Sequence, residues 1–474
     1  MRRKLIHDIS ATSLQVAINQ LFGFAIFYIL SVWFSKNIFG EINWTLAVLL
    51  GAFSILSLGI DQVIIKKIAA GDDPKLMLSL YFFHVLLAGI LFYIFLLVIS
   101  FLFPVVFQKH YLLLFFGIGK LMIFFASPFK QLANGLEKYK SLFYMSVCSN
   151  IVRGAALIVL SFFSALNITT VIIIFIAGDV AELLLSLFIT KKLLKISLSA
   201  KLDKERYFSL IKESLPQAGV VIFTSALARF DWIFLGILAS DIALAEYSFA
   251  FRVFEVSTLP LLIIAPILIP RFTKIFQLTN VDSKATFNDF FSLLKFEIII
   301  ASLIALLLNI LWVPVIDFIT HGKYGSVNRY TILILSCSMP FIYANNFLWS
   351  INFAQSRLKM IFQVFFITFL VNITGNLILI PLFGGEGAAV AYLLAIVAQF
   401  ILFWIKTNVR ELEKYKFIFL TPVAAITGAA SALFIFEQTW LVLIMSLCFF
   451  FLLLFFMKLL GKKDWPVLKR ITTI

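Results

Sequence analysis

Eight ionisable side chains lie deep inside long apolar stretches of this 474-residue chain, where a charge is expensive to bury. A charged group in such a place either pairs with an opposite charge or serves a function. Buried cations suit anionic groups such as phosphates, and paired carboxylates suit protons or sodium ions. The eight are four basic and four acidic residues: Lys120, Arg153, Arg229, Arg252, Asp179, Glu182, Asp231 and Glu255.

The run from Ser214 to Arg271 holds four of the eight, in two apolar segments joined by a short turn. At ~1.5 Å rise per residue, Asp231 and Arg252 would lie roughly 12 Å from the turn, and Arg229 and Glu255 roughly 15 Å. Residues two apart point to opposite sides of a helix, whereas residues three apart share a face. At most one of the first pair can therefore meet the second pair. A structural ion-pair network and a substrate or coupling site both fit this pattern.

Asp179 and Glu182 are three apart, so they share one helix face. A desolvated pair of carboxylates can exchange a proton or a sodium ion, which would make them a coupling site. The same two residues can instead neutralise Lys120 and Arg153, and both interpretations remain open. His84 is a lone histidine in another apolar stretch, and packing explains it better than chemistry.

No motif indicates an enzyme, a cofactor or a metal site. The sequence has no phosphate-binding Gly-rich loop, no HExxH and no plausible Ser/His/Asp set. Its three cysteines, Cys148, Cys337 and Cys448, are widely spaced and form no CxxC pair. We therefore expect no catalytic residues, no cofactor and no bound metal.

The composition is that of an all-α polytopic membrane protein. Hydrophobic residues make up 62% of the chain, charged residues 13%, and the mean hydropathy is +1.05. Fourteen apolar windows are long enough to cross a bilayer. They are 14–34, 43–65, 77–103, 111–133, 142–164, 169–190, 215–238, 244–269, 291–316, 329–350, 360–382, 387–405, 417–435 and 440–458.

The net charge of +15 follows from topology rather than from nucleic-acid binding. With the N-terminus inside, 31 of the 39 Lys and Arg residues fall in cytoplasmic loops and four in outside loops. A multi-pass membrane protein with both termini cytoplasmic is therefore expected. The longest connection, 191–213, carries seven basic residues and predicts a surface-lying amphipathic helix in contact with membrane lipids.

Weak internal repeats predict two similar halves. The segment Phe39–Trp44 resembles Leu244–Phe249, and other short resemblances follow in the same order. We expect a first lobe of six helices at 1–195, an amphipathic linker at 196–213 and a second six-helix lobe at 214–410. Two further helices and a cytoplasmic tail would occupy 411–474.

A series of short motifs resembles a known family. They are FGEIN, SLGIDQVIIKKIA, ANGLEKYK, SLPQAG, RFDWIFLGIL, AEYSFAFRVFE, LIPRFTK and IPLFGGEGAAVAY. Their order is similar to that of the polysaccharide-export branch of the multidrug/oligosaccharidyl-lipid/polysaccharide (MOP) transporter superfamily, most of all Wzx-type O-antigen flippases. The resemblance covers nearly the whole chain.

This resemblance implies two bundles in a V shape, as in MATE transporters, around a central cavity. Alternating access would carry an undecaprenyl-diphosphate-linked oligosaccharide from the cytoplasmic to the periplasmic leaflet. Lys120, Arg153, Arg229 and Arg252 are then the candidates for binding the diphosphate. Asp179, Glu182, Asp231 and Glu255 are the candidates for ion coupling or for charge pairing.

The implied partners are the lipid-linked substrate, a proton or sodium counter-ion and polysaccharide polymerase machinery. Relatives that flip lipid-linked peptidoglycan precursors concentrate arginines in their first two helices, and here those helices have none. A cation-coupled exporter of small molecules is one alternative. A polytopic oligosaccharide polymerase or ligase is another, but such enzymes usually carry a large outside loop, and every outside loop here is short.

Overall fold

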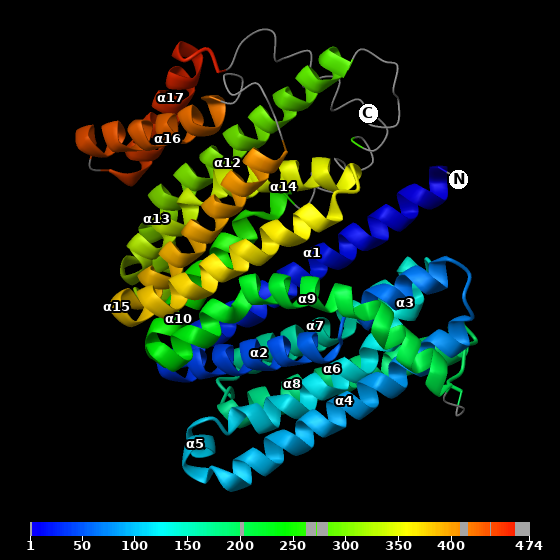
Figure 1. Cartoon of the computed structure of the whole chain (residues 1–474). Coiled ribbons are helices and arrows are strands. Elements are labelled where there is room, and N and C mark those ends of the chain that lie inside the picture. Colours follow the sequence, from blue (N-terminus) through cyan, green and yellow to red (C-terminus); the bar gives the residue numbers. More distant parts are fainter. Residues whose placement is uncertain are drawn as a thin grey trace. The chain divides into compact units, whose positions relative to one another are not determined.

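The computed structural model describes residues 2–199, 203–261, 272, 283–407, 416–436 and 438–459. Every regular element in these ranges is a helix, which confirms the predicted all-α fold (Figure 1). The chain divides by its contacts into two compact units, Met1–Ala245 and Glu246–Ile474. Helix α10 (Asp241–Ser257) begins at the end of the first unit and lies mostly in the second.

The first unit has α6 (Leu112–Gly135) at its centre, because α6 packs against α2, α3, α4, α7 and α8. A long helix, α9, packs on α2 and α3. The other helices of this unit are α1 (Arg2–Trp33), α2 (Lys36–Leu56), α3 (Ile60–Ala69), α4 (Pro74–Leu102), α5 (Pro104–Lys109), α7 (Tyr139–Phe162), α8 (Ile168–Phe188), the π-helix η1 (Ile189–Leu193) and α9 (Lys204–Leu238).

The second unit is built around α12 (Ser283–Thr320), which packs against α13, α14, α16 and α17. Beside it, α15 packs on α13 and α14. The remaining helices are η2 (Ser326–Asn328), α13 (Arg329–Cys337), α14 (Met339–Ala354), α15 (Leu358–Lys406), α16 (Lys416–Ile435) and α17 (Thr439–Phe456).

Eleven helical segments in the described ranges are long and apolar enough to cross a membrane. One of them, Leu358–Lys406, contains both predicted windows 360–382 and 387–405, separated by the non-helical backbone of Gly384 (φ 55°, ψ −127°). The window 215–238 lies within α9, and 244–269 begins in α10 and continues into residues outside the described part. The total of fourteen spans stays a prediction.

The predicted window 43–65 is not one helix. It breaks after α2, where Leu58 (φ 48°) and Gly59 (φ 69°) adopt left-handed backbone, and α3 begins at Ile60. A Cβ on Gly59 would lie 2.8 Å from the backbone nitrogen of Ala218 on α9. Only glycine allows both this backbone conformation and the close approach of α9.

The connection 191–213 does not form the separate surface-lying helix that the sequence predicts. Asp203 caps α9 by accepting a hydrogen bond from the Arg206 backbone N–H (3.1 Å), and the helix then continues unbroken to Leu238. The amphipathic stretch is therefore the first part of α9. At ~1.5 Å per residue, the helix is roughly 52 Å long, well beyond a hydrocarbon core of ~30 Å.

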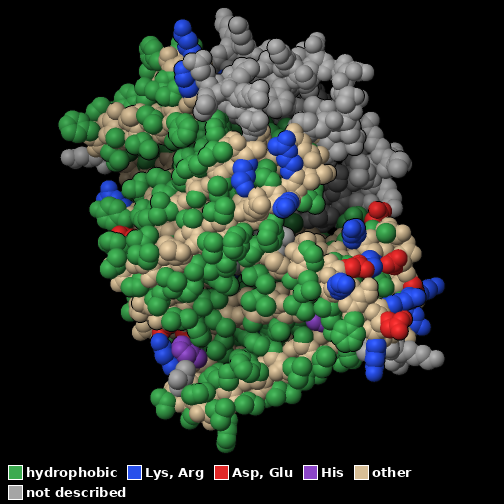
Figure 2. All heavy atoms as spheres, in the orientation of Figure 1, with side chains coloured by type: hydrophobic (Ala, Val, Ile, Leu, Met, Phe, Trp, Pro, Cys, Tyr) green, Lys and Arg blue, Asp and Glu red, His purple; other side chains and the backbone are tan. Residues whose placement is uncertain are grey.

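The surface agrees with a membrane environment. Hydrophobic side chains cover most of the visible face, while charged side chains gather near α3 and near α5 (Figure 2). Large apolar side chains such as Phe101 and Phe162 are more than four-fifths exposed. Bare apolar surface of this extent is expected where lipid tails, rather than water, surround the helices.

Candidate functional site

Four of the predicted site residues meet inside the first unit. Lys120 lies on α6, Arg153 on α7, and Asp179 and Glu182 on α8. Their exposed fractions are 8%, 6%, 1% and 3%, so all four are removed from the surface. We call them, together with Lys130 and Ser149, the buried charge network.

Asp179 is the centre of this network. Its carboxylate forms an ion pair with Arg153 and lies 3.7 Å from Nζ of Lys120. The Ser149 hydroxyl donates a hydrogen bond of 2.9 Å to Oδ1 of the same carboxylate. Two cations and a hydroxyl from α6 and α7 thus converge on one carboxylate from α8, as a buried charge requires.

Two glycines make this convergence possible. A Cβ on Gly119 of α6 would lie 2.6 Å from Oδ2 of Asp179, and a Cβ on Gly178 of α8 would lie 2.7 Å from Cγ of Arg153. Real Cβ atoms do not come so close, so a larger residue at either position would push the helices or the charges apart. The absence of a side chain at Gly178 therefore makes room for Arg153 beside Asp179.

Glu182 pairs with a residue that the sequence analysis did not select. Nζ of Lys130, near the end of α6, lies 2.6 Å from Oε1 of Glu182. Its position near the end of the apolar window 111–133 predicted a cytoplasmic location for Lys130. The helix continues to Gly135, however, which brings Lys130 against α8.

An aromatic ring completes the network. The Arg153 guanidinium carbon is 4.8 Å and the Lys120 Nζ 5.9 Å from the centroid of the Phe175 ring, one turn before Asp179. Both cations therefore lie within reach of a cation–π contact. With three cations and two carboxylates, the network carries one excess positive charge if all five groups are ionised.

In this conformation Lys120 and Arg153, two of the candidates for binding the diphosphate, are buried and paired. The structure thus agrees with the alternative in which carboxylates neutralise them locally. Nε of Arg153 and Oδ2 of Asp179 have no hydrogen-bond partner among the described residues. The ion pair therefore leaves some hydrogen-bonding groups unused. Exchanging it for a new partner would break fewer bonds than in a fully satisfied network.

The other four predicted residues divide between the two units. On α9, the Arg229 guanidinium lies 4.6 Å from the Trp232 ring centroid, and Asp231 is 2% exposed and accepts the Trp232 backbone N–H. On α10, Nη1 of Arg252 lies 2.7 Å from Oε2 of Glu255, as their three-residue spacing predicted. Contact between the α9 residues and the α10 residues stays a prediction.

His84 has the structural role expected for a packed histidine. Its Nε2 lies 2.8 Å from the Leu56 carbonyl oxygen and must donate to it, since a carbonyl only accepts. In the neutral ring Nδ1 then accepts from the Tyr207 hydroxyl at 3.0 Å. Lys67 also pairs with Glu213 at 3.0 Å. These contacts dock the beginning of α9 against α2, α3 and α4.

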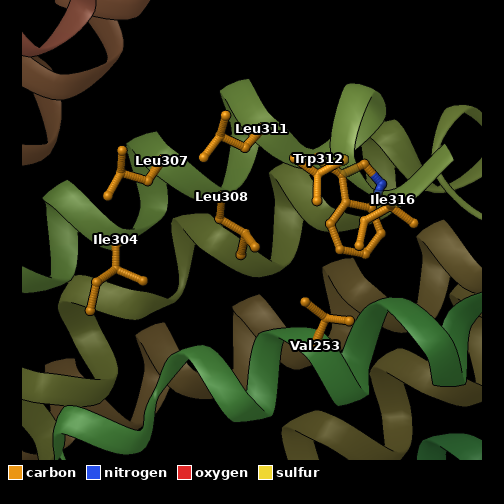
Figure 3. A pocket seen from close by; sticks show the side chains of 8 residues that line it. Val253, Ile304, Leu307, Leu308, Leu311, Trp312 and Ile316 are labelled. Atoms are coloured by element: carbon orange, nitrogen blue, oxygen red, sulfur yellow. The ribbon is translucent and has the colours of Figure 1, made fainter. Parts of the chain in front are cut away.

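Each unit contains a cavity whose lining is described. In the second unit, an apolar groove of about 310 Å³ runs between α10 and α12, lined by Val253, Trp312 and aliphatic side chains (Figure 3). In the first unit, a polar cavity of about 370 Å³ lies beside Lys67, Asp72 and Arg206. The groove offers no charged group, and the charges of the polar cavity already pair with neighbours.

Comparison with known proteins gives a family and a fold. Residues 5–276, more than half of the chain, match the model of a family described as polysaccharide biosynthesis protein. No curated protein sequence matches the chain.

Several solved structures share the fold. The lipid II flippase MurJ in an inward closed conformation has a TM-score of 0.74 and 16% identity, covering 94% of this chain and 98% of that one. An inward-facing multidrug resistance MATE family transporter of the MOP superfamily has a TM-score of 0.67 and 14% identity, covering 86% and 99%. A MOP superfamily transporter from Pyrococcus furiosus has a TM-score of 0.59 and 11% identity, covering 87% and 96%.

Proposed function

The chain belongs to the polysaccharide biosynthesis protein family, and from that premise we propose that it is a lipid-linked oligosaccharide flippase of the MOP superfamily. Its substrate would be an undecaprenyl-diphosphate-linked O-antigen or polysaccharide repeat unit. Alternating access would move this lipid across the bacterial inner membrane. The family match, the shared transporter fold and the apolar spans support the proposal.

The observation that carries the proposal is the buried charge network. A diphosphate cannot cross bare hydrocarbon, because burying its charge without partners would cost many kcal/mol. The network holds Lys120, Arg153 and Lys130 among membrane-spanning helices, with one cation more than its carboxylates need. A diphosphate is an acceptor that such cations can bind strongly.

Binding would proceed by exchange of partners. Arg153 would leave Asp179 and present its planar fork to the diphosphate, which suits two-point recognition. Ser149 would keep its hydrogen bond to Asp179 and so retain one partner for the released carboxylate. Nζ of Lys120, 3.7 Å from the same carboxylate, would continue to neutralise Asp179.

Arg229 and Arg252 would contribute in the same way from α9 and α10. Both are less deeply buried than Arg153, and each already lies against a group that orients it, Trp232 and Glu255 respectively. Asp179, Glu182, Asp231 and Glu255 would act as charge partners in the empty state. A proton or sodium gradient and polysaccharide polymerase machinery are the further partners in this proposal.

The proposed architecture keeps the six-helix lobes at 1–195 and 214–410 and the terminal segment 411–474, with the connection 196–213 leading directly into α9. Both termini would lie in the cytoplasm. The lobes are defined by internal repetition, and so they need not coincide with the two units, which reflect the contacts of one conformation.

Arg153→Lys tests the role of the network in cells that lack the native gene. We expect polysaccharide export to fall about tenfold, since lysine keeps the charge and loses the bidentate fork, and a hydrogen bond to a charged group is worth ~1.5–3 kcal/mol. Arg206→Lys is the matched control, because Arg206 is exposed at the beginning of α9. Export should be read against the amount of folded protein in the membrane. Normal export by both Arg153→Lys and Arg153→Ala would contradict the role of Arg153.

A second candidate function is cation-coupled export of small molecules. The likeness to the multidrug MATE family transporter favours it, although at 14% identity this likeness concerns the fold. An exporter should raise the drug resistance of a sensitive strain and leave a polysaccharide-export mutant uncorrected. The flippase proposal predicts the opposite pair of results.

A further inference from the structure

A buried carboxyl in the second unit has no partner among the residues that the structure describes. Glu297 lies on α12, within the apolar span Leu294–Thr320, and is 2% exposed. Neither of its side-chain oxygens has a hydrogen-bond partner, and it forms no ion pair with any residue that the structure describes. This distinguishes it from Asp179 and Glu182, which both face cations in the first unit.

Two donors on the neighbouring helix are also unsatisfied. The Tyr343 hydroxyl on α14, which packs against α12, is buried and has no hydrogen-bond partner among the described residues. Asn346 follows three residues later on the same face of α14, and its side-chain nitrogen is likewise buried and unpaired. A carboxyl, a hydroxyl and an amide thus lie on two packed helices with unused hydrogen-bonding capacity.

The other elements supply no counter-charge. On α12 itself the nearest charged residue is Lys295, two positions away and therefore on another side of the helix. Besides Tyr343, the charged and titratable residues on the helices that pack against α12 are Asp241, Glu246, Tyr247, Arg252 and Glu255 on α10, Arg329, Tyr330 and Cys337 on α13, Lys416 on α16 and Cys448 on α17. Among the described residues none of these forms an ion pair or hydrogen bond with Glu297.

An ionised carboxylate left in this position would cost far more than a protonated one, because nothing offsets its lost hydration. We propose that Glu297, together with Tyr343 and Asn346, is a proton-binding site of the second unit that is loaded in this conformation. The proton sits on a carboxyl oxygen as a neutral acid. It leaves to water when α12 and α14 shift so that the Tyr343 hydroxyl and the Asn346 amide donate to the carboxylate.

The occupant is a proton rather than a metal ion. Cations such as Ca²⁺ and Mg²⁺ take about six or more oxygen ligands. The site has the two carboxyl oxygens and one hydroxyl, and no group of three or more His, Cys, Asp or Glu suited to a metal occurs in the described ranges. The coupling role of this proton rests on the proposed transport function, whereas its binding does not.

Thermal unfolding of the full-length protein in sodium-free detergent solution tests the binding. The folded protein holds the Glu297 proton at pH values where the unfolded chain, with an ordinary Glu pKa of ~4.3, has already released it, so the unfolding temperature should fall as the pH rises above about 5. Each pH unit in this range changes the folding equilibrium tenfold, about 1.4 kcal/mol, and the fall ends where the folded protein also releases the proton. Glu297→Gln mimics the neutral acid and should lose this dependence. Glu386→Gln, the same change at a half-buried position of α15, should keep it.

Two further measurements keep the test decisive. Tyr343→Phe retains the carboxyl and removes one donor to its charged form, so the fall in stability should begin at the same pH and extend to higher pH. Parallel pH curves for the wild type, Glu297→Gln and Tyr343→Phe would overturn the site. Stabilisation by sodium ions at fixed pH, seen in the wild type and absent in Glu297→Gln, would overturn the proton assignment.

Transport in vesicles then tests the coupling. Glu297→Gln should move the lipid-linked oligosaccharide at a rate that no longer responds to an imposed pH gradient, while the wild type responds. If Glu297→Gln responds as the wild type does, the coupling role fails although transport stands. If the wild type moves no lipid-linked substrate, the proposed function fails, and the pH dependence of stability still decides the binding site.

Discussion

At the residue scale, the buried charge network joins groups that the sequence placed at similar depths but could not place in contact. Depth along a helix follows from hydropathy and rise per residue. The sequence therefore identified Lys120, Arg153, Asp179 and Glu182 as charged residues deep within the membrane. Lys130 and Glu297 were missed because each lies near the end of an apolar window, where a charge is usually solvated. Their burial depends on which helix packs beside them, and that is tertiary information.

The Lys130–Glu182 pair gives a prediction at this scale. Glu182→Gln removes the partner of a largely buried lysine and should lower stability by roughly 1–3 kcal/mol, a value reduced from that of a fully buried pair because Lys130 remains 18% exposed. The double variant Lys130→Gln/Glu182→Gln removes both charges and should recover most of the loss. The unfolding temperatures of the wild type, Lys130→Gln, Glu182→Gln and the double variant form the cycle.

The same single variant tests the proposed coupling role of the acidic pair. If Glu182 carries a coupled ion, Glu182→Gln should also lose the response of transport to a proton or sodium gradient. A variant with wild-type stability and a wild-type gradient response would contradict both the pairing and the coupling role.

At the element scale, hydropathy predicted most helices to within a few residues, for example α4, α8, α16 and α17. It failed where the backbone turns without a polar loop, as between α2 and α3. It also separated the amphipathic linker from the following span, although α9 continues through both. Contacts between Tyr207 and His84 and between Lys67 and Glu213 hold the first turns of α9, and no local pattern in the sequence contains these pairs.

Gly59 gives a prediction at the element scale. Gly59→Ala places a Cβ against the α9 backbone and in left-handed conformation, so it should cost roughly 1–2 kcal/mol for the backbone and more for the contact. Gly71→Ala is the control, because Gly71 also has positive φ (101°) but nothing within 4 Å of its Cβ position. Thermal stability should fall more for Gly59→Ala. Equal losses would mean that the approach of α9 imposes no constraint.

At the scale of the whole molecule, the proposed transport requires a charged diphosphate to pass between apolar membrane-spanning helices. The chain is a multi-pass membrane protein with a transporter fold, and its first unit holds cations among its spans. Composition alone predicted the membrane, and the order of short motifs predicted the family. Neither composition nor motif order could predict that the charges of the network are paired, because the pairing depends on how α6, α7 and α8 pack.

The central claim is that these cations carry a diphosphate-linked lipid across the membrane. It is tested most directly by reconstituting the purified protein in vesicles and following a labelled undecaprenyl-diphosphate-linked oligosaccharide with a reagent that reaches one leaflet. We predict transfer at least tenfold faster than in protein-free vesicles, and no acceleration for an analogue whose diphosphate is replaced by an uncharged linker. Equal rates with and without protein, or equal acceleration of both lipids, would contradict the account.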